Sequence, residues 1–340
     1  MFIATVFQIA GMLGGVASII SLAGLALPKP AIAAGVGVFT AALLVLGRYK
    51  VIEIASTWMV VAFTLSTLVA VAALQFTPFA VTGANLAEGF SFSLPPSFTV
   101  AFAAFGVIGV GASELIYYPY WLLESGYARR VGAPDGSPAW RERARGWIRV
   151  LHADVWTSCL IYTGATLAFY VLGAAILKKK GLDVTNADMI PTLSQMYIET
   201  FGAWSLWFFL IGAAAVLYST VFGATAANVR LVADALEVFG AKTYRDEADR
   251  QGTLRTLSIA FPAIWTTIFL LWGEPVTLVF VGAIAQGLML PFLGILALYQ
   301  HHRHTPAELR PGTLWRSGLW LSAACMMVAG GYQVITRLLP

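Results

Sequence analysis

Nine long apolar runs divide the chain, and each approaches the length that a helix needs to cross a lipid bilayer. About 20 consecutive apolar residues span the hydrocarbon core. A window of that size finds the runs at 3–26, 31–47, 51–75, 99–123, 155–177, 202–228, 257–273, 275–299 and 314–336. No connection between them is long enough to hold a separate globular domain. The pattern predicts an all-α polytopic membrane protein in which residues 1–340 form a single transmembrane domain.

Lysine and arginine are distributed unevenly between the two ends of these runs. The side on which the chain starts receives 16 of them, and the opposite side receives 5. Membrane proteins carry their excess of Lys and Arg in cytoplasmic loops. We therefore expect a multi-pass protein of the cell (inner) membrane with the N-terminus of this chain in the cytoplasm. The two most basic connections, at about 128–152 and 238–256, are expected to be cytosolic loops.

The overall composition agrees with this assignment. Hydrophobic residues make up 59% of the chain and charged residues 11%, and the mean hydropathy is +0.77. Soluble domains carry about 25% charged residues, so a soluble enzyme or binding module is excluded. Basic patches interleaved with aromatic residues are absent, which excludes a nucleic-acid partner. Cys159 and Cys325 both fall in apolar runs and define no disulfide framework.

The fourth run contains a stretch that is unusual for a membrane span, "GVGASELIYYPYW". Glu114 lies near its centre, where an acid costs roughly 2.5–3.5 kcal/mol on insertion scales. Two glycines precede it and Pro119 follows it, so the helix is expected to break here. Loose carbonyls and a carboxylate are oxygen ligands that suit a hard or borderline cation. The stretch predicts a cation site formed by Ala112, Ser113 and Glu114.

Other candidates are weaker, and a purely structural interpretation stays open for each. Glu114 could pair with an Arg or Tyr at a proline kink, and Tyr117 is a hydrogen-bond partner under either interpretation. Gln286 lies in a second Gly/Pro-interrupted run, "VGAIAQGLMLPFLG", where binding site and packing are equally open. Asn228 belongs to a stripe of small and polar residues in the sixth run, and such stripes usually pack helices together.

Four segments are similar to helices of one transporter family. "GRYKVIEIASTWMVVAFTL" resembles its fifth helix, and "FGVIGVGASELIYYPYWLLESG" its sixth, discontinuous helix. "LYSTVFGATAANVRLVADAL" resembles the eighth, and "GLMLPFLGILALYQ" the tenth. The family is that of the Nramp-type divalent metal transporters. The resemblance, to a divergent bacterial branch, covers nearly the whole chain. It implies a LeuT-type inverted-repeat fold whose broken helices hold the ion at the midplane.

The resemblance also marks departures from the family pattern. Ala112 matches the family's metal-binding alanine, but Leu115 stands where the family has a methionine, and Glu114 precedes it. Exchanging a thioether for a carboxylate favours harder ions such as Mg²⁺ or Mn²⁺. The family's tenth-helix glutamine aligns with Met289, one turn from Gln286. The nine runs match the family's third to eleventh helices, and no Asp-Pro-Gly motif of the first helix occurs, so we expect an N-terminally incomplete sequence.

These observations lead us to expect a secondary transporter of divalent cations and not an enzyme. The cation is its substrate and the bilayer its other partner; no cofactor is expected, and proton coupling and oligomeric state stay open. One alternative is an amino-acid or organic-cation symporter of the same fold. Another is a cation-sensing relative that does not transport. A membrane metalloenzyme using His301, His302 and His304 of "HHRH" is the least favoured.

Overall fold

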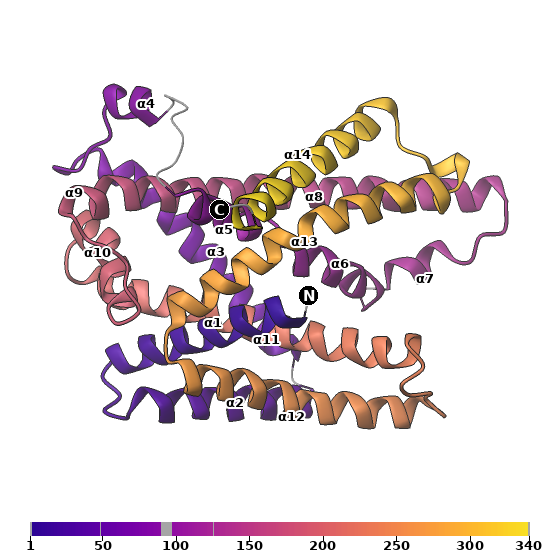
Figure 1. Cartoon of the computed structure of the whole chain (residues 1–340), viewed down its shortest axis with the longest axis horizontal. Helices are drawn as coiled ribbons and strands as arrows, with labels where there is room; N and C mark the ends of the chain where they lie inside the picture. The colour runs from indigo at the N-terminus through magenta and orange to yellow at the C-terminus, as the bar shows by residue number, and fades with distance from the viewer. Residues whose placement is uncertain (1, 48, 90–96, 125, 339–340) are drawn as a thin grey trace. The chain divides into compact units, whose positions relative to one another are not determined.

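The computed structural model describes residues 2–47, 49–89, 97–124 and 126–338, and in this part of the chain the regular secondary structure is all helical, without a strand (Figure 1). Within it, nine stretches are long and apolar enough to cross a membrane. This confirms the nine runs expected from the sequence and the polytopic all-α fold class. Arg48, one of the residues in the charge count, lies outside the described residues.

The chain forms two compact units, and the division between them falls within the helices α1, α8 and α13. Unit 1 comprises Met1–Ala4, Pro95–Thr163 and Ala283–Pro340, and unit 2 comprises Thr5–Leu94 and Gly164–Gly282. Unit 1 contains α5 (Phe98–Val107), α6 (Ala112–Glu124), α7 (Tyr127–Val131), most of α8 (Pro138–Leu172), most of α13 (Pro275–Arg303), the 3-10 turn η2 (Ala307–Leu309) and α14 (Thr313–Leu338). Unit 2 contains nearly all of α1 (Phe2–Leu22), α2 (Lys29–Leu46), α3 (Tyr49–Leu74), α4 (Gly83–Gly89), the end of α8, the π turn η1 (Gly173–Leu177), α9 (Lys178–Lys180), α10 (Met189–Phe201), α11 (Ser205–Val238), α12 (Glu247–Trp272) and the start of α13.

Unit 2 has two hydrophobic clusters. The first surrounds the fully buried Trp265, where α2 packs along α12 (Figure 1). The Trp265 indole donates a hydrogen bond of 3.2 Å to the Thr225 hydroxyl of α11. The second cluster is aromatic, with Phe63 stacked on Tyr197 at 5.5 Å between ring centroids. The indole nitrogen of Trp265, although buried, thus has a hydrogen-bond partner, as buried polar groups usually do.

The start of α13 is held by a single polar side chain from the segment before α10. The Asn186 amide oxygen accepts hydrogen bonds from the backbone nitrogens of Val276 at 2.8 Å and Thr277 at 3.1 Å. Its amide nitrogen donates to the Thr277 hydroxyl at 3.1 Å. Asn186 thus occupies two of the backbone donors that a helix leaves unpaired at its N-terminus.

Replacing Asn186 with alanine is expected to lower the free energy of unfolding by about 1–2 kcal/mol, the usual effect of losing an N-terminal cap. Thermal unfolding of the detergent-solubilised chain measures it. The matched control is Asn85→Ala, because the hydrogen bonds of Asn85 within the described residues are exposed and local, all with Thr82. Equal unfolding midpoints for the two variants would show that Asn186 does not stabilise α13.

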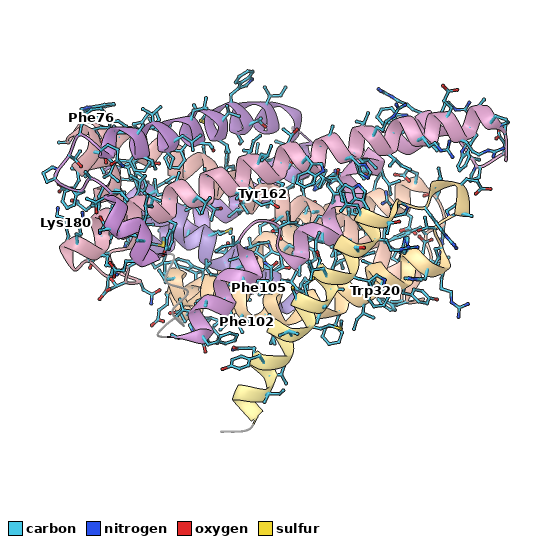
Figure 2. The ribbon with its side chains drawn as sticks, turned by 90° about the horizontal axis from the view of Figure 1, so that it is seen from above. Phe76, Phe102, Phe105, Tyr162, Lys180 and Trp320 are labelled. Carbon is cyan, nitrogen blue, oxygen red and sulfur yellow. The ribbon has the colours of Figure 1, made fainter. Side chains whose placement is uncertain are left out.

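Unit 1 is organised by a close approach between α5 and α13. A Cβ on Gly106 would stand 2.7 Å from the Gly287 nitrogen, and one on Gly287 would stand 2.8 Å from the Phe102 ring. Phe102 and Phe105 are labelled on α5 in Figure 2. On the same side of α5, Phe98 contacts Tyr332 of α14 edge to face at 4.3 Å between centroids. These contacts fix the end of α5 against the middle of α13.

One of the two basic connections differs from its expected form. The stretch 238–256 is not loop throughout, because α12 begins at Glu247. The Asp246 carboxylate accepts a hydrogen bond of 2.8 Å from the Asp249 nitrogen and caps this helix. In the stretch 128–152, the Gly/Pro-rich turn is followed by α8 from Pro138 onward, as its basic helical pattern indicates.

Candidate cation site at the break between α5 and α6

The helix predicted to be discontinuous is interrupted just before Glu114. Helix α5 ends at Val107, the backbone bends through 108–110, and α6 begins at Ala112. Gly109 has a φ of +82°, which L-residues rarely adopt. A Cβ there would also stand 2.9 Å from the ring of Tyr162, which Figure 2 labels on α8. The helix is therefore interrupted at Gly109, where the backbone conformation and the neighbouring ring leave room for glycine alone.

Pro119 does not take part in this break, which corrects the sequence-based expectation. It lies inside α6, five residues beyond Glu114. The proline removes one backbone donor, so the Leu115 carbonyl has no intrahelical N–H to accept, but α6 continues to Glu124. A single missing hydrogen bond does not end a helix whose neighbouring turns are intact.

Gln286 of α13 reaches the break and binds its backbone. Its Oε1 accepts a hydrogen bond of 3.2 Å from the Ser113 nitrogen, although the two residues are 173 positions apart in the sequence. Gln286 is fully buried, and Ser113 is 1% exposed. The glycine contacts between α5 and α13 explain this placement, because they bring α13 against the end of α5. The structure therefore places Gln286 at the break, and a role in ion binding stays a prediction.

Gly111 leaves a space that two side-chain oxygens share. A Cβ at this position would overlap both Oε1 of Gln286 and Oε2 of Glu114. The amide oxygen and the carboxylate oxygen are therefore near neighbours on the same side of the Gly111 backbone. Such a pair of oxygens, one of them charged, matches the ligand preference of Mg²⁺, Ca²⁺ or Mn²⁺.

The carboxylate of Glu114 has an unused acceptor in this space. Its Oε2 is buried and has no hydrogen-bond partner among the residues that the structure describes. Buried polar atoms are normally satisfied, and a buried carboxylate oxygen without a partner is costly. Glu114 lies in the first turn of α6, and a helix N-terminus attracts negative charge. This location offsets part of the cost of burying the carboxylate. A cation would satisfy the remaining acceptor.

Of the other predicted residues, three lie on α6 and one lies in unit 2. Ala112 is fully buried at the start of α6, and Tyr117 is buried one turn beyond Ser113. Leu115 is 43% exposed and contributes none of the three heavy atoms nearest to a Cβ on Gly111. Asn228 belongs to unit 2, where its amide donates 2.9 Å to the Ala224 carbonyl of its own helix. The candidate site in unit 1 thus consists of Ala112, Ser113 and Glu114 at the start of α6 together with Gln286.

Two further polar features of unit 1 lie outside the Glu114–Gln286 pair. Tyr118 donates a hydrogen bond of 2.6 Å to Asp154. This bond connects α6 to α8 one turn after Glu114 in the chain. In "HHRH", His302 contacts the Leu298 carbonyl through Nδ1 and packs on Trp320. In the described part of the chain, no three His, Cys, Asp or Glu side chains gather as a metal site. The metalloenzyme interpretation therefore gains no support from these histidines.

Comparison with known proteins places the chain in a family. The model of the Nramp family, "Natural resistance-associated macrophage protein-like", matches residues 1–336. None of the curated proteins matches the chain. Nearly the full length is covered, and the nine apolar spans agree with the family's polytopic, LeuT-like fold. The chain belongs to the Nramp family of multi-pass membrane proteins, which are divalent metal ion transporters and not enzymes.

Proposed function

We propose that this chain is a secondary transporter that binds its divalent cation at the break between α5 and α6, with Glu114 as the charged ligand. The Ala112 carbonyl, Ser113 and the Gln286 amide oxygen complete the surroundings of the ion. The observation that carries the proposal is the buried Oε2 of Glu114, which has no hydrogen-bond partner among the described residues and lies beside Oε1 of Gln286 over Gly111.

The chemistry of these groups favours a hard cation. A carboxylate and an amide oxygen are hard ligands, and Leu115, at the position of the family's methionine, brings no sulfur. Selectivity between divalent ions follows ligand type, so Mg²⁺ and Mn²⁺ should be preferred over ions that seek thioethers. A carboxylate that binds a cation can also exchange it for a proton, which makes Glu114 the group to test for proton coupling.

The orientation in the membrane follows from the distribution of basic residues. The 16-to-5 excess of Lys and Arg supports a cytoplasmic N-terminus for this chain and a place in the inner membrane. With that orientation, the 128–152 and 238–256 stretches face the cytoplasm. Movement of the cation into the cell is part of the proposal and is measured by the uptake experiment below.

Uptake by proteoliposomes that contain the full chain tests the substrate class. We expect accumulation of labelled Mn²⁺ that an excess of Mg²⁺ reduces at least several-fold, because both ions suit oxygen ligands. A mixture of amino acids and organic cations at the same excess is the control and should leave uptake unchanged. Inhibition by that mixture and not by Mg²⁺ would instead indicate an organic substrate. Mn²⁺ binding without accumulation would indicate a cation sensor.

A further inference from the structure

Unit 1 contains a second polar site that is separate from the helix break. A cavity of about 790 Å³ lies between the first turns of α8 and the loop that joins α13 to α14. Its volume is within the range of small-molecule sites, about 300–1,000 Å³. Helix α8 contributes Arg141, Arg145 and Arg149, and the loop contributes Arg310. The cation site uses none of these residues.

The helical spacing explains why the arginines converge. Arg141, Arg145 and Arg149 follow one another at intervals of four residues, which places them on one face of α8. The loop is fastened to this face, because Arg145 donates a hydrogen bond of 3.3 Å to the Glu308 carbonyl. Two carboxylates, Glu142 and Glu308, also line the cavity, so the four arginines leave it with a positive charge.

The guanidinium groups retain donors for a ligand. Arg141 and Arg310 each donate one hydrogen bond to a backbone carbonyl, at 3.3 and 3.4 Å. Arg149 has no hydrogen bond or ion pair to any residue that the structure describes. The Nε of Arg141 is buried and likewise lacks a partner within the described residues. A guanidinium carries five N–H donors in a fork that matches phosphate oxygens.

The cavity lies where a membrane surface would be. Helix α8 has 35 residues, about 50 Å at 1.5 Å per residue, whereas the hydrocarbon core is about 30 Å thick. Its first turns therefore extend out of the core. His152 lines the cavity and stacks on Trp315 at 4.5 Å between centroids, and Trp156 lies 6.2 Å from the same ring. Tryptophans mark the membrane–water interface.

We propose that this cavity binds the phosphate headgroup of an anionic membrane lipid. Four arginines recognise the phosphate, and the tryptophans at the start of the apolar parts of α8 and α14 accompany the acyl chains. Basic pockets beside transmembrane helices are suited to anionic headgroups. A free phosphate or phosphate ester could bind the same arginines. It has no acyl chain, so it would make no use of the adjoining tryptophans.

A binding titration with the full chain in neutral detergent tests the proposal. The probes are short-chain phosphatidylglycerol, short-chain phosphatidylcholine and glycerol 3-phosphate, with no divalent cation present, so the result does not depend on the cation site. We expect saturable binding of phosphatidylglycerol at least about tenfold tighter than that of phosphatidylcholine. Glycerol 3-phosphate that competes as strongly as the lipid would assign the cavity to a soluble anion and overturn the lipid proposal.

Two matched double variants localise the binding. Arg141→Gln/Arg149→Gln removes two cavity arginines and is expected to weaken phosphatidylglycerol binding roughly tenfold or more. Arg143→Gln/Arg316→Gln removes the same charge from the same unit outside the cavity, and Arg143, like Arg141, donates one hydrogen bond to a backbone carbonyl. Its affinity should stay within twofold, roughly the scatter expected of a surface substitution. Equal weakening in both variants would show a general charge effect and contradict the proposal.

Discussion

Replacing Glu114 with glutamine is expected to reduce divalent cation uptake at least about 100-fold, the upper end of the effect of losing even a supporting group at a metal site. Glutamine preserves the size of the side chain and one carbonyl oxygen but removes the negative charge. In glutamine, an amide nitrogen takes the place of one carboxylate oxygen. The buried Oε2, which has no partner among the described residues, is then either that nitrogen or an uncharged amide oxygen. Uptake of labelled Mn²⁺ into proteoliposomes measures the loss.

Three further variants define the cause. Glu114→Ala should be as inactive as Glu114→Gln, while Glu114→Asp keeps the charge and should retain part of the activity. Glu237 is an exposed acid near the end of α11, so Glu237→Gln controls for the loss of one charge. Full uptake by both Glu114→Gln and Glu114→Ala would remove Glu114 from the site. A loss in Glu237→Gln of the same size would show that overall charge matters and not this ligand.

Substitution of Gly111 with alanine is the second change with a large expected effect. Its backbone is not in the left-handed region, so alanine can adopt the conformation. The added Cβ would nevertheless overlap Oε1 of Gln286 and Oε2 of Glu114. Overpacking of this kind typically costs 1–3 kcal/mol. The added methyl group would push the two oxygens apart. If they hold the cation, uptake should fall at least about tenfold, since 1.4 kcal/mol corresponds to a factor of ten.

Gly164→Ala is the matched control, because a Cβ on that helical glycine meets nothing within 4 Å. It should transport normally and be slightly more stable, as alanine is the better helix former. Thermal unfolding of both variants separates lost transport from lost folding. A folded Gly111→Ala protein with normal uptake would show that the space between the two oxygens does not hold the substrate.

The membrane spans and the helix break could be predicted from sequence because both depend on local properties. A run of apolar residues is readable without knowing its neighbours, and the structure has nine such spans in its described part. The glycines before Glu114 likewise marked a weak point in one helix. Pro119 was wrongly included in the break, since a proline can remain within a helix that loses one hydrogen bond.

The pairing of Gln286 with Ser113 could not be predicted, because it joins residues 173 positions apart. It depends on the backbone contact at Gly106 and Gly287, and each glycine alone looks like an ordinary small residue in a span. The early start of α12 was missed for a different reason. Asp246, three residues before Asp249, is a helix-capping signal that lay within a stretch read as a charged loop.

The measurement that tests the central proposal most directly is equilibrium binding of Mn²⁺ to the detergent-solubilised chain, followed by electron paramagnetic resonance of the free ion. Binding needs no transport cycle, so it isolates the site over Gly111. We predict one saturable site in the unaltered chain and at least about 100-fold weaker binding in Glu114→Gln. Equal affinity in the two proteins would contradict the proposal and place the cation elsewhere.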